Sequence, residues 1–169
     1  MFTRPPFLLF VAILAALSVS SVMVITPIGD DFWWSRLAPV RYSVHLLETT
    51  RGFGVPRTDS LGCRVPFGPA DAWRTLDEQP NADSLFKKVF ARGRAPGRLY
   101  SLIGLYRHKS QQFSMLLNRA RVDSTPLMVW DWRQWRGATV PLAKLAQVDS
   151  IRTWAALFAD GGQGPECAA

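Results

Sequence analysis

The sequence predicts a mainly helical α+β fold: an N-terminal hydrophobic helix, serving as signal or anchor, and then a small helical domain with one short β-hairpin. Three observations support it. Residues 5–29 carry no charge, residues 81–121 have the apolar spacing of three short helices, and residues 126–132 (PLMVWDW) are rich in β-forming side chains. The chain is divided accordingly into an N-terminal signal or anchor (1–29), a juxtamembrane helix with an irregular connection (30–80), a helical core with the hairpin (81–160) and a flexible tail (161–169).

The composition indicates one folded domain with a preference for anionic partners. The chain has 169 residues, of which 48% are hydrophobic, and this content is too high for an intrinsically disordered protein. The formal net charge is +7 and the pI is about 10.1. Such a charge favours lipid head groups, acidic polymers or nucleic acid as partners and says nothing about the fold.

The N-terminal apolar segment is long enough to cross a membrane. It runs over 25 residues from Pro5 to Gly29, and about 20 suffice for a helix to span the bilayer core. The alternatives are a cleaved secretory signal, with Arg4 as its positive region and Ser18 and Ser20 before the cut, and an ordinary buried helix. Both exported forms place the rest of the chain outside the cytoplasm, either single-pass in the cell membrane or secreted to the periplasm.

Residues 30–80 have weaker signals. Apolar positions favour a helix from Ser35 to about Thr50, with Pro39 in its first turn. The Gly- and Pro-rich stretch from Arg51 to Pro69 indicates an irregular connection with one extended piece around Cys63 to Phe67. Ala70 to Glu78 is expected to form one or two helical turns that end before Pro80.

Residues 81–121 predict three packed helices. In the first, Leu85, Phe86, Val89 and Phe90 mark the apolar face, either Asn81 or Asp83 supplies the N-cap, and Gly93 marks the end. The second begins near Pro96 and is apolar on most of its circumference, which makes it the most buried element. Within it, either Gly104 permits close approach of a neighbouring backbone, or the glycine is tolerated without a special role. Ser110 is expected to cap the third helix, whose apolar side consists of Phe113, Leu116, Leu117 and Ala120.

Two further elements are expected after residue 125. The strand Pro126–Trp132 should pair with Ala138–Leu142 across a turn at Gln134–Gly137, and the hairpin should lie against the helices. Ser150 should cap a final helix that ends near Gly161. Its buried side is expected to consist of Ile151, Trp154, Leu157 and Phe158.

The most unusual chemical feature is a long interval without acids. No Asp or Glu lies between Asp83 and Asp123, so much of the positive charge there should face solvent together. The cations are Lys87, Lys88, Arg92, Arg94, Arg98, Arg107, Lys109, Arg119 and Arg121. They predict a basic helical face that binds anionic lipid, envelope polymer or a protein partner, or that only aids solubility. Nucleic acid is not expected, because the N-terminal segment argues for export.

Trp130, Trp132 and Trp135 form the second candidate site. On a strand Trp130 and Trp132 point to the same face, where they could stack on sugar rings. The alternative is that this face packs on the helices. Cys63 and Cys167 are the only cysteines, and in an exported chain they allow one disulfide or remain two thiols.

Catalytic and metal signatures are weak. His45 and His108 lack a second ligand nearby in sequence, so we expect no metal and no cofactor. A nucleophilic site would have to combine Cys63 with one of these histidines. Carboxylates for glycoside chemistry could come from Asp71, Asp77, Glu78 and Asp131, although no pair is marked as opposed.

The sequence therefore predicts a non-enzymatic extracytoplasmic envelope protein that presents a basic helical face to an anionic or protein partner. Two alternatives stay open. One is a small extracytoplasmic hydrolase that acts on wall glycan or peptide, and the other is a sugar-binding module that uses Trp130 and Trp132.

Overall fold

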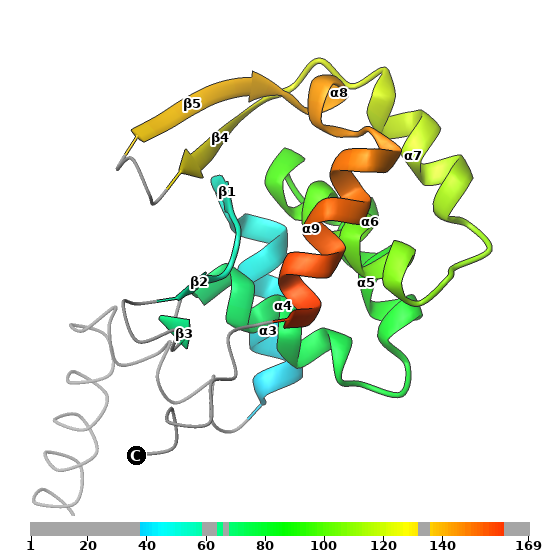
Figure 1. The fold of residues 1–169 in the computed structure, drawn as a ribbon. Helices are drawn as coiled ribbons and strands as arrows, with labels where there is room; N and C mark the ends of the chain where they lie inside the picture. Colours follow the sequence, from blue (N-terminus) through cyan, green and yellow to red (C-terminus); the bar gives the residue numbers. More distant parts are fainter. Residues whose placement is uncertain (1–37, 59–63, 66–67, 132–135, 161–169) are drawn as a thin grey trace, which may run out of the picture. The chain divides into compact units, whose positions relative to one another are not determined.

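The computed structural model describes residues 38–58, 64–65, 68–131 and 136–160 (Figure 1). The chain divides into two compact units, Met1–Pro39 and Val40–Ala169, and the described residues belong almost entirely to the second. This unit is mainly helical with a small three-stranded sheet, which confirms the predicted mainly helical α+β class. The N-terminal hydrophobic segment lies outside the described residues.

Seven helices and five strands make up the described part of the chain. The helices are α3 (Pro39–Thr49), α4 (Gly68–Asp77), α5 (Ala82–Arg92), α6 (Ala95–Arg107), α7 (Phe113–Arg121), α8 (Leu142–Leu145) and α9 (Val148–Asp160). The strands are β1 (Gly52–Gly54), β2 (Arg57–Thr58), β3 (Arg64–Val65), β4 (Pro126–Asp131) and β5 (Arg136–Pro141). None of the helices in these described ranges is both long enough and apolar enough to span a membrane.

Helix α6 is the centre of the fold, and the prediction that it is the most buried element is confirmed. Ten of its thirteen residues are buried. It packs against α5, α7 and α9 and against strands β1 and β4, and Figure 1 shows it surrounded by these elements. A helix that is apolar on most of its surface must be covered on all sides, which explains why other elements enclose it.

Two glycines let α6 approach its neighbours closely. A Cβ atom at Gly97 would lie 2.2 Å from the carbonyl oxygen of Leu47, so only glycine allows α6 to meet the backbone of α3. At Gly104 a Cβ atom would lie 2.3 Å from the ring of Phe86 on α5. Gly104 therefore makes room for an aromatic ring, and Gly97 is the glycine that admits a neighbouring backbone.

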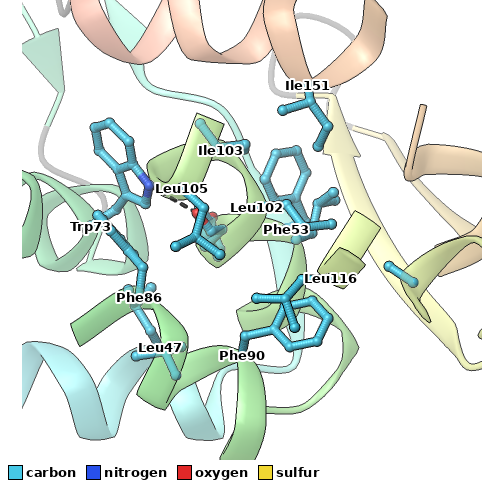
Figure 2. Close-up of a cluster of buried hydrophobic side chains, with 14 of the residues drawn as sticks. Leu47, Phe53, Trp73, Phe86, Phe90, Leu102, Ile103, Leu105, Leu116 and Ile151 are labelled. Carbon is cyan, nitrogen blue, oxygen red and sulfur yellow. Dashed lines mark hydrogen bonds between the residues drawn. The ribbon is translucent and has the colours of Figure 1, made fainter. Parts of the chain in front are cut away.

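Tyr100 joins α6 to the sheet through its buried hydroxyl. The hydroxyl donates to the carbonyl oxygen of Gly54 at 2.8 Å and accepts the Gly54 N–H at 3.0 Å. The backbone carbonyl of Tyr100 accepts the indole N–H of Trp73 at 2.9 Å, so α4 is fixed to the same turn of α6. The large core side chains of Trp73, Phe53 and Phe86 surround this point (Figure 2). Strand β1 and helix α4 are thus both held to α6 by buried hydrogen bonds.

The sheet contains the predicted hairpin and one strand that the sequence did not reveal. β4 pairs antiparallel with β5, with Leu127 opposite Val140 and Trp130 opposite Gly137. β1 pairs parallel with β4 and completes the order β1-β4-β5. The second hairpin strand ends at Pro141 and not at Leu142, because Leu142 begins α8 and is fully buried. β2 and β3 form a separate antiparallel pair.

The predicted helices are present, but α3 begins at Pro39 and not at Ser35, α4 begins at Gly68 and not at Ala70, and two caps and one buried face also differ from prediction. α7 begins at Phe113 with Gln112 as its N-cap, so the prediction that Ser110 caps it is wrong. The Ser110 hydroxyl instead accepts the Gln112 N–H at 3.3 Å in the preceding turn. α9 begins at Val148, which places Ser150 inside its first turn. Leu157, predicted to be buried, is 46% exposed, and Ala155 takes its place in the core.

Elements before residue 80 contribute substantially to the core. Leu47 of α3, Phe53 of β1, and Trp73 and Leu76 of α4 are all fully or almost fully buried. They pack in one cluster with the side chains of α5, α6 and α9. Residues 40–80 are therefore part of the same folded unit as the helices that follow.

Candidate functional site

Several of the predicted basic residues lie near one end of α6 or the other, while Lys87 and Lys88 lie in the middle of α5. The ion pair between Arg98 and Asp123 places the end of α7 beside the beginning of α6. Arg107 and Lys109 lie at the other end, where α6 finishes. A helix of thirteen residues is about 20 Å long, so the two groups are separate surfaces.

Acids outside the acid-free interval or at its borders neutralise three of the nine cations. Arg98 pairs with Asp123 at 2.6 Å, and Arg107 pairs with Asp77 at 3.1 Å. Lys87 pairs with Asp83 one helical turn earlier. Arg107 also lies over the Trp73 ring, 5.6 Å from its centroid, so its role is partly structural.

Of the other six cations, one forms a hydrogen bond that joins two helices, and five are exposed. Arg121 donates to the Ala146 carbonyl at 3.2 Å and so helps to fix α7 to the end of α8. Five cations are exposed and form no ion pair with any residue of the described ranges: Lys88, Arg92, Arg94, Lys109 and Arg119.

A hollow of about 460 Å³ lies between α5 and α7. Its buried side chains are apolar, and three cations are among the residues that line it. It is lined by Lys87, Phe90, Ala91, Arg98, Gln112, Met115, Leu116, Arg119, Ala120, Val122 and Asp123. We call it the α5–α7 hollow.

A second hollow, of about 320 Å³, adjoins the first at Arg98. It lies at the start of α6 and also contains Arg51 and Arg94, together with the backbone around Pro96 and Thr125. Arg51 lies outside the acid-free interval, which is why the sequence did not identify it. Arginines from two distant parts of the chain thus meet at this end of α6.

Asp123 fixes the geometry where the two hollows meet. Its carboxylate accepts the Thr125 N–H at 2.9 Å and an Arg98 guanidinium N–H at 2.6 Å, and its backbone carbonyl accepts the Ala143 N–H. Burial alone would raise the pKa of Asp123, but the hydrogen bonds from Thr125 and the charge of Arg98 outweigh it, so the pKa lies below the ordinary value of 3.8. The carboxylate is therefore charged at neutral pH and orients Arg98.

Trp130 is a flat aromatic surface on the sheet. A Cβ atom at Gly52 would lie 3.2 Å from the Trp130 indole, and one at Gly137 would lie 3.4 Å from it, so the ring lies across the glycines of both neighbouring strands. Trp130 is 37% exposed, and Met128, two residues earlier on the same side of β4, is 41% exposed. The Trp130 ring is therefore partly covered and partly exposed. Trp132 and Trp135 lie outside the described residues.

The catalytic candidates do not come together in the described part of the chain. The Nε2 atom of His108 lies 3.0 Å from a carboxylate oxygen of Asp77, a contact that sequence reasoning missed because 31 positions separate the residues. Neither residue lines either of the two hollows described above. No group of three potential metal ligands occurs among the described residues. His45 is exposed on α3, and Glu78 pairs with Arg74. The side chains of Cys63, Asp131 and Cys167 are not described.

Comparison with known proteins does not add a family. No family model, no curated protein and no solved structure matches this chain. Function must therefore be argued from the residues themselves.

Two residues of the α5–α7 hollow were not identified from the sequence. Met115 is 52% exposed and Val122 is 83% exposed, although both are large apolar side chains. The signal was present in the pattern: Met115 lies in α7 off its apolar stripe, and Val122 follows the helix end. Large apolar residues off a buried face are candidates for contact with a partner.

Proposed function

We propose that this protein is a non-enzymatic envelope protein that works outside the cytoplasmic membrane and presents a basic helical surface to an anionic partner. One observation carries the proposal: exposed cations without ion pairs lie at or near the two hollows that share Arg98 at the start of α6. Of the predicted residues, Arg119 lines the α5–α7 hollow, Arg94 lines the second hollow, and Arg92 is exposed at the end of α5, two residues before Arg94. We call the surface formed by these three residues the basic surface.

The charge of this surface has a physical consequence for binding. Arg92 and Arg94 flank the turn between α5 and α6, and Arg119 lies in the last turn of α7, beside Arg98. Grouped charges of one sign raise the local potential, attract anions and accelerate their association. If these charges served only solubility, there would be no reason for them to lie beside a hollow.

A charge-reversal experiment tests the proposal. The triple variant Arg92→Glu, Arg94→Glu and Arg119→Glu should lose binding to vesicles that contain an anionic lipid or to an acidic polymer such as polyglutamate. The matched control reverses three exposed cations elsewhere: Arg41, Lys109 and Lys144. Both variants lower the formal net charge from +7 to +1, so only position differs. Equal binding by both variants, or undiminished binding by the first, would rule the proposal out.

The cellular location has a separate test. The uncharged stretch at residues 5–29 supports export, either as a retained anchor or as a cleaved signal. Cell fractionation combined with N-terminal sequencing distinguishes the two, because a retained anchor keeps Met1 in the membrane fraction. Recovery of the intact chain from the cytosol would contradict both forms.

Trp130 supports a second candidate function, a sugar-binding module. Its ring lies flat over Gly52 and Gly137 and is partly exposed, and such a ring can stack on the apolar face of a pyranose. Titration with a soluble N-acetylglucosamine oligomer should quench tryptophan fluorescence, and Trp130→Ala should remove the response while Met128→Ala should keep it. Absence of any saturable response in the wild-type chain would exclude this function.

A further inference from the structure

The α5–α7 hollow combines an apolar floor with a positive rim, and this combination defines the partner. We propose that it binds a protein segment in which a large apolar side chain is flanked by Asp or Glu residues. The inference rests on the proposed function, because it assumes that the basic surface engages a partner, and it narrows that partner to an acidic peptide segment.

The floor of the hollow is suited to an apolar side chain. Phe90, Leu116 and Ala120 form its buried part and belong to the core of the domain. Figure 2 shows Phe90 and Leu116 beside each other in this core. Met115 and Val122 extend this apolar surface into solvent, where they are 52% and 83% exposed. Covering apolar surface stabilises a complex by about 25 cal/mol per Å² before the costs of association, so these two side chains gain most from a partner. A volume of about 460 Å³ is large enough for a bulky side chain.

The cations at the rim of the hollow favour a segment that carries negative charge. Lys87 stands on the α5 side, Arg119 on the α7 side, and Arg98 at the end formed by α6. The one acid that lines the hollow is Asp123, whose carboxylate is already occupied by Thr125 and Arg98. Lys87 and Arg98 are each paired with an acid, Asp83 and Asp123, so Arg119 is the rim cation that has no ion pair among the described residues, and a carboxylate on the bound segment would pair with it.

The second hollow extends the positive surface in one direction. Arg98 lines both hollows, and Arg51 and Arg94 continue beyond it at the start of α6. A segment seated in the α5–α7 hollow can therefore place acids on both sides of its apolar residue, towards Arg119 at one end and towards Arg94 at the other. This arrangement favours one placement of the bound segment, with its apolar residue in the α5–α7 hollow and an acid on each side.

A concave site favours a protein segment over a membrane. Phe90, Leu116 and Ala120 lie at the bottom of a hollow, where a flat lipid surface does not reach them, whereas a protruding side chain does. Peripheral membrane binding instead uses an apolar face that projects into the bilayer. An anionic membrane is accordingly the alternative that the experiment must separate.

The test uses the full-length chain in a neutral detergent and a displayed library of random peptides. The peptides that it enriches should carry a large apolar residue between acids. A synthetic copy of an enriched peptide is then titrated by fluorescence anisotropy. Arg119→Glu and the double change Met115→Gln with Val122→Ser should each weaken binding by about tenfold or more, which corresponds to about 1.4 kcal/mol. Lys109→Glu, the matched charge change at the far end of α6, should stay within about twofold.

A second variant tests the inference even if the double variant fails to fold. Gln112 lines the hollow, is exposed and forms the N-cap of α7, where a negative charge favours the helix dipole. Gln112→Glu should therefore keep or raise the urea midpoint and still weaken binding of the acidic peptide several-fold. Undiminished binding by this variant would count against the inference even if the double variant failed to fold.

The outcomes separate this inference from the function on which it rests. If enriched peptides show no acidic preference, or if changes at Met115, Val122 and Gln112 leave their binding unchanged, the inference is wrong. If the triple reversal of the basic surface still abolishes binding to anionic vesicles in that case, the proposed function stands with lipid as the partner. If neither peptides nor vesicles respond to any of these changes, both are wrong.

Discussion

Replacing Tyr100 by Phe isolates the hydrogen bonds that hold the sheet to the central helix. The change removes one oxygen atom and keeps the ring in its place against Phe53 and Phe158. The lost hydroxyl serves both polar groups of Gly54, at 2.8 Å and 3.0 Å, and Gly54 is buried. Water does not reach these groups easily, so they have no ready replacement partner.

The magnitude follows from the cost of leaving buried polar groups unpaired. Each such loss typically costs about 1 to 3 kcal/mol. Because one hydroxyl serves both groups of Gly54, we expect Tyr100→Phe to lower the free energy of unfolding by about 2 to 3 kcal/mol. For a domain of this size that corresponds to a fall in Tm of roughly 6 to 12 °C.

The same residue gives an alkaline signature. Burial raises the pKa of Tyr100 far above its ordinary value of 10.0, against the opposing effect of the Gly54 backbone hydrogen bond. The folded state therefore keeps the proton that the unfolded state releases, and this contribution is fully present below pH 10 and lost as the pH rises further. Above pH 10 the wild type should lose up to about 1.4 kcal/mol per pH unit through Tyr100. The Phe variant lacks this loss, so the stability difference should narrow in alkali.

Urea unfolding of the full-length chain at pH 8 and at pH 11, followed by tryptophan fluorescence, measures both effects. Tyr42→Phe is the control, because Tyr42 is only half-buried and no hydrogen bond of its hydroxyl occurs among the described residues. A Tyr100→Phe variant within about 0.5 kcal/mol of wild type at pH 8 would refute the role given to the hydroxyl. A stability difference that stays constant up to pH 11 would refute the alkaline argument alone.

Three further predictions concern close packing and acid stability. Gly97→Ala should destabilise by about 2 to 3 kcal/mol in urea unfolding, since the new methyl group meets the Leu47 carbonyl oxygen and the backbone of α3 must move away. Gly104→Ala should destabilise by about 1 to 3 kcal/mol, and most of the loss should disappear when Phe86→Leu removes the ring that it meets, as a double-mutant cycle would measure. Asp123→Asn should cost about 1 kcal/mol at pH 7, and because the pKa of Asp123 is lowered, this difference should begin to shrink as the pH falls below about 4 and disappear only when the pH is below the pKa of the folded state.

Matched controls keep these three measurements interpretable. Gly68→Ala changes a helical glycine with only ordinary contact to a side chain, at 3.6 Å, and should be nearly neutral. Asp149→Asn removes a carboxylate that is 93% exposed and lies 3.6 Å from Arg152, so its effect should be close to zero at every pH. An equal loss of stability in a control and in its test variant would contradict the reason given for that variant.

The helical core could be predicted because its signals are local. In α5 the apolar stripe with Phe86, Val89 and Phe90 has helical spacing, and Gly93 ends the helix where the sequence indicated. Pro96 lies in the first turn of α6, as expected from its missing N–H. Information within about four residues was sufficient to fix these elements.

The sheet and the charge pattern depended on distant partners and could only be predicted in part. β1 consists of Gly52, Phe53 and Gly54, a short sequence without β-forming periodicity, and it becomes a strand only because β4 is beside it. The absence of acids after Asp83 is visible in the sequence, but the pairing of Asp123 with Arg98 is not. Three of the nine cations are consequently paired with acids, which the acid-free interval alone does not reveal.

The parallel pairing of β1 with β4 has a consequence for the order of assembly. Gly52 is opposite Met128, 76 positions later in the chain, so this contact closes a very long loop. Loop closure over such a distance carries an entropic cost that adjacent helices do not bear, and it slows folding. During synthesis, β1 cannot pair until β4 has left the ribosome, whereas α5 and α6 can already associate. We expect pulse-labelled hydrogen exchange to show protection in that helical pair before any protection in β1.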